Sequence, residues 1–162
     1  MLPEELITRA ARVVQLLTEK KHTLALAESC TGGLIASCIT SVSGSSAVLE
    51  RGFITYSNRS KTEEVNVDAN LIIQHGAVSA EVAAAMAIGA RKVANTDVGL
   101  SVTGIAGPSG GTADKPVGLV FLALSNKDNV DVRRFQFSGD RDEIRRQAVV
   151  KALSMLVSVG NE

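Results

Sequence analysis

Thr23-Leu24-Ala25-Leu26-Ala27-Glu28-Ser29-Cys30-Thr31-Gly32-Gly33 is the stretch that decides the fold class of this chain. Its first five residues are mostly apolar, which predicts a short buried strand over residues 23–27. The turn over residues 28–33 contains two glycines, and the helical run of residues 34–39 follows it directly. A buried strand that passes through a Gly-rich turn into a helix predicts the repeating unit of an α/β sheet.

The rest of the chain continues this alternation of helices and strands. The apolar spacing and the helix-start signals predict helices over residues 3–20, 82–93 and 140–157, a short helix that Asn58 caps, and a helical turn over 68–74. Further strands are predicted over residues 52–56, 98–102, 117–124 and 130–137. The last two are joined by only five residues, so they are expected to form an antiparallel hairpin. We therefore expect one α/β domain over residues 1–162, with three α/β/α layers around a mixed sheet of about five strands.

Composition and charge exclude several classes of protein. The chain has 162 residues, of which 45% are hydrophobic, and its 17 basic and 17 acidic residues cancel. Zero net charge favours neither nucleic acid nor an acidic membrane surface as a partner. No apolar stretch approaches the roughly 20 residues that span a bilayer. Cys30 and Cys38 lie eight residues apart in what reads as one helix, about 12 Å at a rise of about 1.5 Å per residue, which is too far for a disulfide. We expect two buried thiols and a cytoplasmic protein, because the acidic start of the chain is not a signal peptide.

The sequence offers little support for metal-dependent, histidine-dependent or P-loop chemistry. The two histidines, His22 and His75, are not spaced as a ligand pair, and neither lies where a catalytic loop is expected. Residues 104–111 are rich in glycine but do not match a dinucleotide-binding motif, and no P-loop motif is present. No serine is followed three residues later by lysine, so the Ser-x-x-Lys pattern of β-lactamases is also absent.

Polar side chains follow the first three predicted strands. Ser29 ends the first strand, Tyr56 the second and Thr103 the third. Ligands bind at the carboxyl ends of the strands in open α/β sheets, so these loops are expected to converge. Ser29 and Thr31 stand at a helix start, where free N–H groups attract a phosphate or an oxyanion. They fit a simple helix N-cap equally well, and the turn alone leaves both interpretations open.

Lys61 is the candidate that would turn this cap into an active site. A serine hydroxyl needs a base, and without a suitable histidine a desolvated lysine is the main alternative. Tyr56, the only tyrosine in the chain, is placed to hold that amine through its hydroxyl. Judged from its neighbours alone, Lys61 reads as an ordinary surface lysine.

Five segments in order resemble the CinA C-terminal domain family. They are residues 27–33, Tyr56-Ser57-Asn58-x-x-Lys61, residues 75–79, residues 103–108 and residues 115–118. The resemblance covers nearly the whole chain, and the start of the chain resembles the stand-alone members of the family. It implies a homo-oligomer that needs no metal and no organic cofactor. The implied activity is hydrolysis of the carboxamide of nicotinamide mononucleotide to nicotinate mononucleotide and ammonia.

The resemblance also implies the roles of the site residues. Ser29 attacks the carboxamide carbon, Lys61 acts as general base, and Tyr56 supports the lysine. The turn residues Cys30, Thr31, Gly32 and Gly33 are expected at the oxyanion, and Thr103 and Gly104 beside the substrate.

The substrate phosphate has three candidate ligands: the Ser/Gly loop that contains Ser45, the loop over residues 107–112 that begins at Gly107, and Arg145. Arg141 shares a helix face with Arg145, and we choose Arg145 because Ile144 and Ala148 must be buried beside it. Two other functions remain open at this point: a nucleotide-binding module without catalysis, and a Ser-Lys amidase for another small amide.

Overall fold

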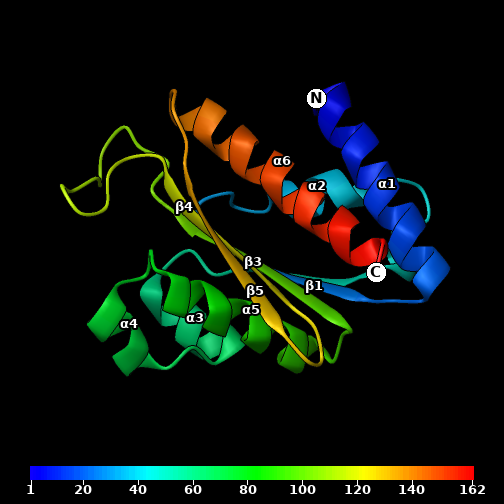
Figure 1. Ribbon diagram of the computed structural model, residues 1–162, viewed down its shortest axis with the longest axis horizontal. Helices are drawn as coiled ribbons and strands as arrows, with labels where there is room; N and C mark the ends of the chain where they lie inside the picture. Colours follow the sequence, from blue (N-terminus) through cyan, green and yellow to red (C-terminus); the bar gives the residue numbers. More distant parts are fainter.

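Five strands form one mixed sheet in the computed structural model, which describes residues 1–162 (Figure 1). The spatial order is β2-β1-β3-β4-β5, with β1 parallel to β2 and β3, and β4 antiparallel to β3 and β5. The strands are β1 (Leu24–Glu28), β2 (Leu49–Ile54), β3 (Val98–Gly104), β4 (Leu119–Ser125) and β5 (Val130–Gln136). The mixed sheet and the terminal hairpin are both as predicted.

Helices cover both faces of the sheet. One layer contains α1 (Glu4–Lys20), α2 (Leu34–Thr40) and α6 (Arg141–Gly160), and the other contains α3 (Asn58–Val65), α4 (Ala69–His75) and α5 (Ala80–Ala94) (Figure 1). A 3₁₀ turn, η1 (Ser45–Ala47), precedes β2. The three-layer α/β/α architecture is therefore confirmed. No helix is long and apolar enough to cross a membrane.

Most helix and strand bounds lie within a few residues of the prediction, with three differences that affect the site. The second strand ends at Ile54, two residues earlier than predicted, so Tyr56 lies beyond it. The cap of α3 is Ser57 rather than Asn58, in a capping box in which Ser57 and Ser60 each accept a hydrogen bond from the other's backbone N–H. Helix α2 begins at Leu34, so Cys30 belongs to the turn and not to one helix with Cys38. Both cysteines are buried and free.

Helix α5 packs unusually close to its neighbours because two glycines leave room for backbone. A Cβ on Gly89 would lie 1.8 Å from the carbonyl oxygen of Val65, the last residue of α3. A Cβ on Gly99 of β3 would lie 2.2 Å from the carbonyl oxygen of Ala87. The backbone of α5 thus fixes the position of α3, which carries the buried Lys61.

We expect Gly89→Ala to destabilise the protein by roughly 1–3 kcal/mol, because the added methyl forces α3 and α5 apart. Thermal unfolding measures the change. The matched control is Gly52→Ala on the edge strand β2, where a Cβ would meet only ordinary contacts of 3.6 Å and 4.0 Å. A Gly89→Ala protein that melts at the wild-type temperature would contradict this account of the packing.

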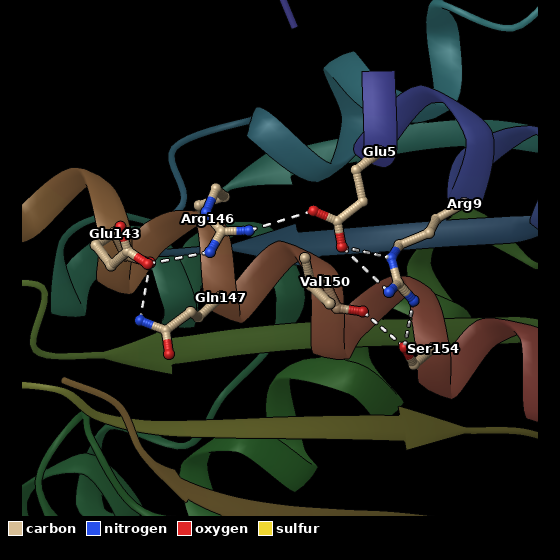
Figure 2. Close-up of polar contacts among 7 residues, drawn as sticks. All are labelled: Glu5, Arg9, Glu143, Arg146, Gln147, Val150 and Ser154. Carbon is tan, nitrogen blue, oxygen red and sulfur yellow. Dashed lines mark hydrogen bonds and ion pairs between the residues drawn. The ribbon is translucent and has the colours of Figure 1, made fainter. Parts of the chain in front are cut away.

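Polar contacts join α1 to α6 across their exposed faces (Figure 2). Arg146 reaches the Glu5 carboxylate at 3.4 Å and Glu143 at 3.0 Å, and Arg9 pairs with Glu5 at 3.2 Å. Exposed pairs of this kind stabilise a protein by only about 0–1 kcal/mol each. The larger contribution comes from the apolar core between these helices and the sheet, with Leu17 and Leu153 among its fully buried residues.

Candidate active site

The ends of β1 and β2 bring Ser29 and Lys61 together although they are 32 residues apart. The N–H of Thr55 donates to the carbonyl of Glu28 at 2.9 Å, which sets the segment before α3 beside the nucleophile turn. Lys61 lies in the second turn of α3, and its side chain extends back toward the start of that helix. Its Nζ lies 3.2 Å from Ser29 Oγ. The pair is therefore in hydrogen-bonding contact.

Lys61 is buried and has no carboxylate partner. The side chain is 1% exposed, and its Nζ donates to the Thr55 carbonyl at 2.7 Å, with longer contacts to the carbonyls of Tyr56 and Ser57 at 3.4 and 3.5 Å. Desolvation by burial lowers the pKa of Lys61 from its ordinary value of 10.5. The sequence expectation of a surface lysine, drawn from its neighbours alone, is wrong for this residue.

Tyr56 contacts Lys61 through its backbone and not through its hydroxyl. The Tyr56 side chain is 59% exposed, and its hydroxyl accepts a hydrogen bond from Arg141 Nη2 at 3.1 Å. The expectation that the phenol holds the amine is therefore wrong. Because β2 ends at Ile54, the backbone turns toward α3 and directs carbonyls, rather than the tyrosine ring, at Nζ.

Cys30 is the other potential nucleophile beside Ser29. Burial is the main cause that raises the pKa of its thiol, to about 12. At neutral pH this thiol is protonated, and the thiol is a far weaker nucleophile than the thiolate. Of the two adjacent side chains, only the Ser29 hydroxyl contacts a base.

The nucleophile turn is held by Glu28 rather than by a conventional cap. Gly33 occupies the N-cap position of α2 at φ +98°, a backbone conformation that favours glycine, and makes no side-chain cap bond. Glu28 Oε2 accepts from the N–H groups of Gly33 and Ile35. The N-cap interpretation of Ser29 and Thr31 is wrong, because the Thr31 hydroxyl also donates to Glu28, at 2.6 Å.

Backbone N–H groups in the turn differ in whether they are already bonded. The Gly32 N–H donates to the carbonyl of Ser29 at 3.1 Å, and the Gly33 N–H donates to Glu28 at 3.1 Å. The N–H groups of Cys30 and Thr31 donate to no other residue of the chain. Of the four turn residues expected at the oxyanion, Gly32 and Gly33 therefore have no free N–H to offer.

Arg145 binds the turn from the opposite side. Its Nε donates to the carbonyl of Cys30 at 3.2 Å, and its Nη2 donates to the carbonyl of Thr31 at 3.1 Å. The Arg145 guanidinium is therefore hydrogen-bonded to backbone carbonyls and does not form an anion site. The residue that reaches the cavity from the first turn of α6 is Arg141, one helical turn earlier.

A cavity of about 270 Å³ opens at the carboxyl ends of β1 and β3. Arg141 crosses its mouth, donating to the carbonyl of Gly107 at 2.8 Å and to the Tyr56 hydroxyl. The cavity is lined by Ser29, Cys30, Tyr56, Asn58, Lys61, Ala77, Val78, Thr103, Gly104, Ile105, Ala106, Gly107, Ser109, Gly110 and Arg141. Three strand ends converge on it, as the sequence predicted.

Two other predicted site residues differ in their placement. Thr103 lines the cavity, but its hydroxyl donates to the carbonyl of Ala77 at 2.8 Å and so holds the loop before α5. Ser45 lies in η1, before β2, and therefore at the amino edge of the parallel strands. The structure does not bring Ser45 to the site. The order of the elements could have shown this. A segment that precedes a parallel strand lies at the opposite edge of the sheet from the segment that follows the strand.

Sequence reasoning did not assign a role in the site to Glu28 or Asn58, and it chose Arg145, which does not line the cavity, over Arg141, which does. The sequence did contain a signal for Glu28, because an acidic residue stands directly between a strand predicted to be buried and the candidate nucleophile. No group of three or more His, Cys, Asp or Glu side chains is arranged to hold a metal ion.

Known proteins resemble this chain along most of its length. Residues 7–159 match the model of the CinA C-terminal domain. A CinA-like protein of Citrifermentans bemidjiense is 58% identical over 90% of this chain but only 35% of its own length. The chain thus spans about a third of the length of the curated relatives that it matches first. The nicotinamide-nucleotide amidohydrolase PncC of Escherichia coli K12 is 48% identical over 96% of this chain and 95% of its own length.

Solved structures match the fold just as closely. The competence/damage inducible protein CihA of Agrobacterium tumefaciens superposes with a TM-score of 0.96 at 41% identity, covering 100% of this chain and 99% of that chain. A CinA superfamily protein of Escherichia coli superposes with a TM-score of 0.92 at 31% identity, covering 98% of this chain and 94% of the other. On the family match and these relatives together, the chain belongs to the CinA C-terminal domain family.

Proposed function

We propose that this protein hydrolyses the carboxamide of nicotinamide mononucleotide, releasing nicotinate mononucleotide and ammonia, in pyridine-nucleotide salvage. The observation that carries the proposal is the 3.2 Å contact between Ser29 Oγ and the buried amine of Lys61, at the floor of a small cavity. The name of the Escherichia coli relative supplies the substrate. A cavity of about 270 Å³ is at the small end of ligand sites, which suits a mononucleotide better than a larger ligand.

Acylation begins with proton transfer from the Ser29 hydroxyl to the neutral amine of Lys61. The lowered pKa of Lys61 supplies this neutral form closer to physiological pH. Ser29 Oγ then forms a bond to the carboxamide carbon, whose C=O electron pair moves onto oxygen. When the tetrahedral intermediate collapses, the C–N bond breaks and the Lys61 ammonium returns its proton to the departing nitrogen as ammonia forms.

The oxyanion is stabilised by the N–H groups of Cys30 and Thr31, the two amides of the turn that donate to no other residue. Deacylation repeats the proton transfer with water in place of Ser29. Lys61 takes a proton from the water, the hydroxide attacks the ester carbon, and the Ser29 oxygen leaves with a proton from Lys61. The product is nicotinate mononucleotide.

The substrate phosphate binds near Arg141 at the mouth of the cavity. The guanidinium makes one hydrogen bond to Gly107 and one to Tyr56, which leaves further N–H donors for an anion. The N–H groups of Gly107, Ser109 and Gly110 on the facing loop donate to no acceptor in the chain. Arg141, Gly107, Ser109 and Gly110 line one cavity, and a cationic side chain together with free amides is what a phosphate site requires.

We expect Arg141→Gln to raise KM for the mononucleotide by about tenfold or more, since an interaction with a charged group contributes about 1.5–3 kcal/mol. The effect on the riboside, which has no phosphate, should be small. The matched control is Arg12→Gln on the exposed face of α1, where the side chain bonds only to Gln15. Steady-state ammonia release from both substrates measures the difference. Equal losses on mononucleotide and riboside would remove Arg141 from the phosphate site.

The substrate proposal is tested by comparing ammonia release from nicotinamide mononucleotide, nicotinamide riboside and nicotinamide. A site that binds phosphate should strongly prefer the mononucleotide. Preference for another small amide would keep the Ser-Lys chemistry and change the substrate. Saturable binding of the mononucleotide without product, even at high protein concentration, would instead identify a binding module.

Cellular location and assembly are further parts of the proposal. Two buried, unpaired thiols suit the reducing cytoplasm, where this salvage reaction would have its substrate. We also expect a homo-oligomer, as the family resemblance implies, and light scattering on the purified protein measures its mass.

A further inference from the structure

Glu28 is a buried carboxylate directly beside the nucleophile, and its contacts are unusually many. The residue is 1% exposed. Its Oε2 accepts from the Thr31 hydroxyl at 2.6 Å and from the N–H groups of Gly33 and Ile35 at 3.1 Å each. Its Oε1 accepts from the N–H of Ala36 at 2.8 Å. A carboxylate has enough lone pairs to accept all four donors.

These contacts determine which amides of the turn remain free. The N–H groups at the start of a helix are normally available to an anion. Here Glu28 occupies those of Ile35 and Ala36 and also the Gly33 N–H just before the helix. The N–H groups of Cys30 and Thr31, one and two residues after Ser29, donate to no other residue of the chain.

Arg145 fixes the same turn through its carbonyls. A trans peptide is planar, with its C=O and N–H pointing in opposite directions. Because the carbonyl of Cys30 points at Arg145 Nε, the N–H of Thr31 in the same peptide points away from Arg145. Glu28 thus accepts hydrogen bonds from donors of the turn, and Arg145 donates hydrogen bonds to its carbonyl groups.

We propose that Glu28 is a positioning residue that locks the turn over residues 29–33, so that the free N–H groups of Cys30 and Thr31 form the oxyanion hole for attack by Ser29. This inference rests on the proposed amide hydrolysis. Glu28 does not touch the reacting atoms, because its two oxygens are bonded to donors of residues 31–36. It acts through the peptide groups that it orients.

Glu28→Gln tests this role with almost no change of shape. The glutamine amide offers one acceptor oxygen and places an NH₂ donor where the carboxylate oxygen accepted. In one amide orientation this NH₂ faces the N–H of Ala36 in α2, and in the other it faces the N–H groups of Gly33 and Ile35, so the contacts that hold the turn against α2 must rearrange in either case. The matched control is Asp68→Asn, which makes the same change at the carboxylate that caps α4 by accepting from Asn70.

We expect Glu28→Gln to lower kcat for nicotinamide mononucleotide by tenfold or more, approaching the roughly 10²–10³-fold loss of one oxyanion-hole donor. KM should stay within about threefold, because the cavity lining is unchanged. The assay temperature is set well below the melting temperature of each variant, so that all molecules are folded. Asp68→Asn should keep the wild-type kcat. A role in folding alone predicts wild-type kcat for Glu28→Gln under these conditions, and that result would overturn the proposal.

A second measurement separates this inference from the choice of substrate. p-Nitrophenyl acetate acylates a serine through an oxyanion of the same kind, and mass spectrometry of the Ser29 peptide follows the ester. If the wild type is acylated but releases no ammonia from the mononucleotide, the substrate proposal fails while slower acylation of Glu28→Gln still supports the positioning role. Equal acylation of the two proteins, or no acylation of the wild type with either compound, would overturn it.

Discussion

Lys61→Met is expected to lower kcat by roughly 10²–10⁴-fold, the usual contribution of general acid–base catalysis. Methionine keeps most of the length and apolar character of the buried stem but has no basic nitrogen. The amine lies 3.2 Å from Ser29 Oγ, and no other basic side chain contacts that hydroxyl. The matched control is Lys92→Met on the exposed face of α5, which should keep wild-type activity.

The pH dependence of the wild type should report the same residue. Burial lowers the pKa of Lys61, so kcat should rise with pH as the neutral amine forms, and the midpoint of this rise should lie below pH 10.5. Below the lowered pKa, the amine is protonated and cannot accept the serine proton. In Lys61→Met, the residual activity should lose this rising limb.

Lys61→Met should make the protein more stable although it lowers the activity. Between the lowered pKa of Lys61 in the folded protein and its ordinary value of 10.5, the unfolded chain binds more protons than the folded one. The free energy of unfolding therefore rises with pH across this window, and below it the folded protein bears the full cost of burying an ammonium. Lys61→Met removes that cost, so we expect a higher melting temperature at pH 7 and a weaker pH dependence. An unchanged or lower melting temperature would contradict the desolvation account.

Ser29→Ala is expected to abolish nearly all turnover, with kcat at least about 10³-fold lower, as for other nucleophile deletions. Substrate binding should persist, because alanine leaves the Arg141 side of the cavity intact. Calorimetric titration with nicotinamide mononucleotide measures this binding separately from the chemistry. The matched control is Ser154→Ala on α6, whose hydroxyl donates to the carbonyl of Val150 (Figure 2) and which does not line the cavity. Wild-type turnover by Ser29→Ala would refute the nucleophile.

Fold class was predictable because its signals are local and repeated. The apolar strand before Ser29, the glycines after it, and the short link before β5 each specify one connection, and together they define a mixed sheet. The start of β2 was missed because this edge strand contains the exposed Glu50 and Arg51, which interrupt an apolar pattern. Edge strands need fewer apolar residues than buried ones, so composition marks them poorly.

The site was predictable in its location but not in its contacts. Arg141 and Arg145 share a helix face, and only the tertiary placement of the loop at Gly107 and of the Thr31 turn decides which one reaches the cavity. The neighbours of Lys61 in sequence are polar, so its burial depends on packing of α3 against α5, which no local pattern reports.

The most direct test of the central claim, that a neutral Lys61 activates Ser29, is the labelling rate of Ser29 by a small fluorophosphonate. We predict that the label attaches to Ser29 and that the labelling rate rises with pH, with a midpoint below pH 10.5. Nicotinamide mononucleotide should protect the site, and labelling should be nearly lost in Lys61→Met. Labelling of another residue, or labelling of Ser29 in Lys61→Met at the wild-type rate, would contradict the claim.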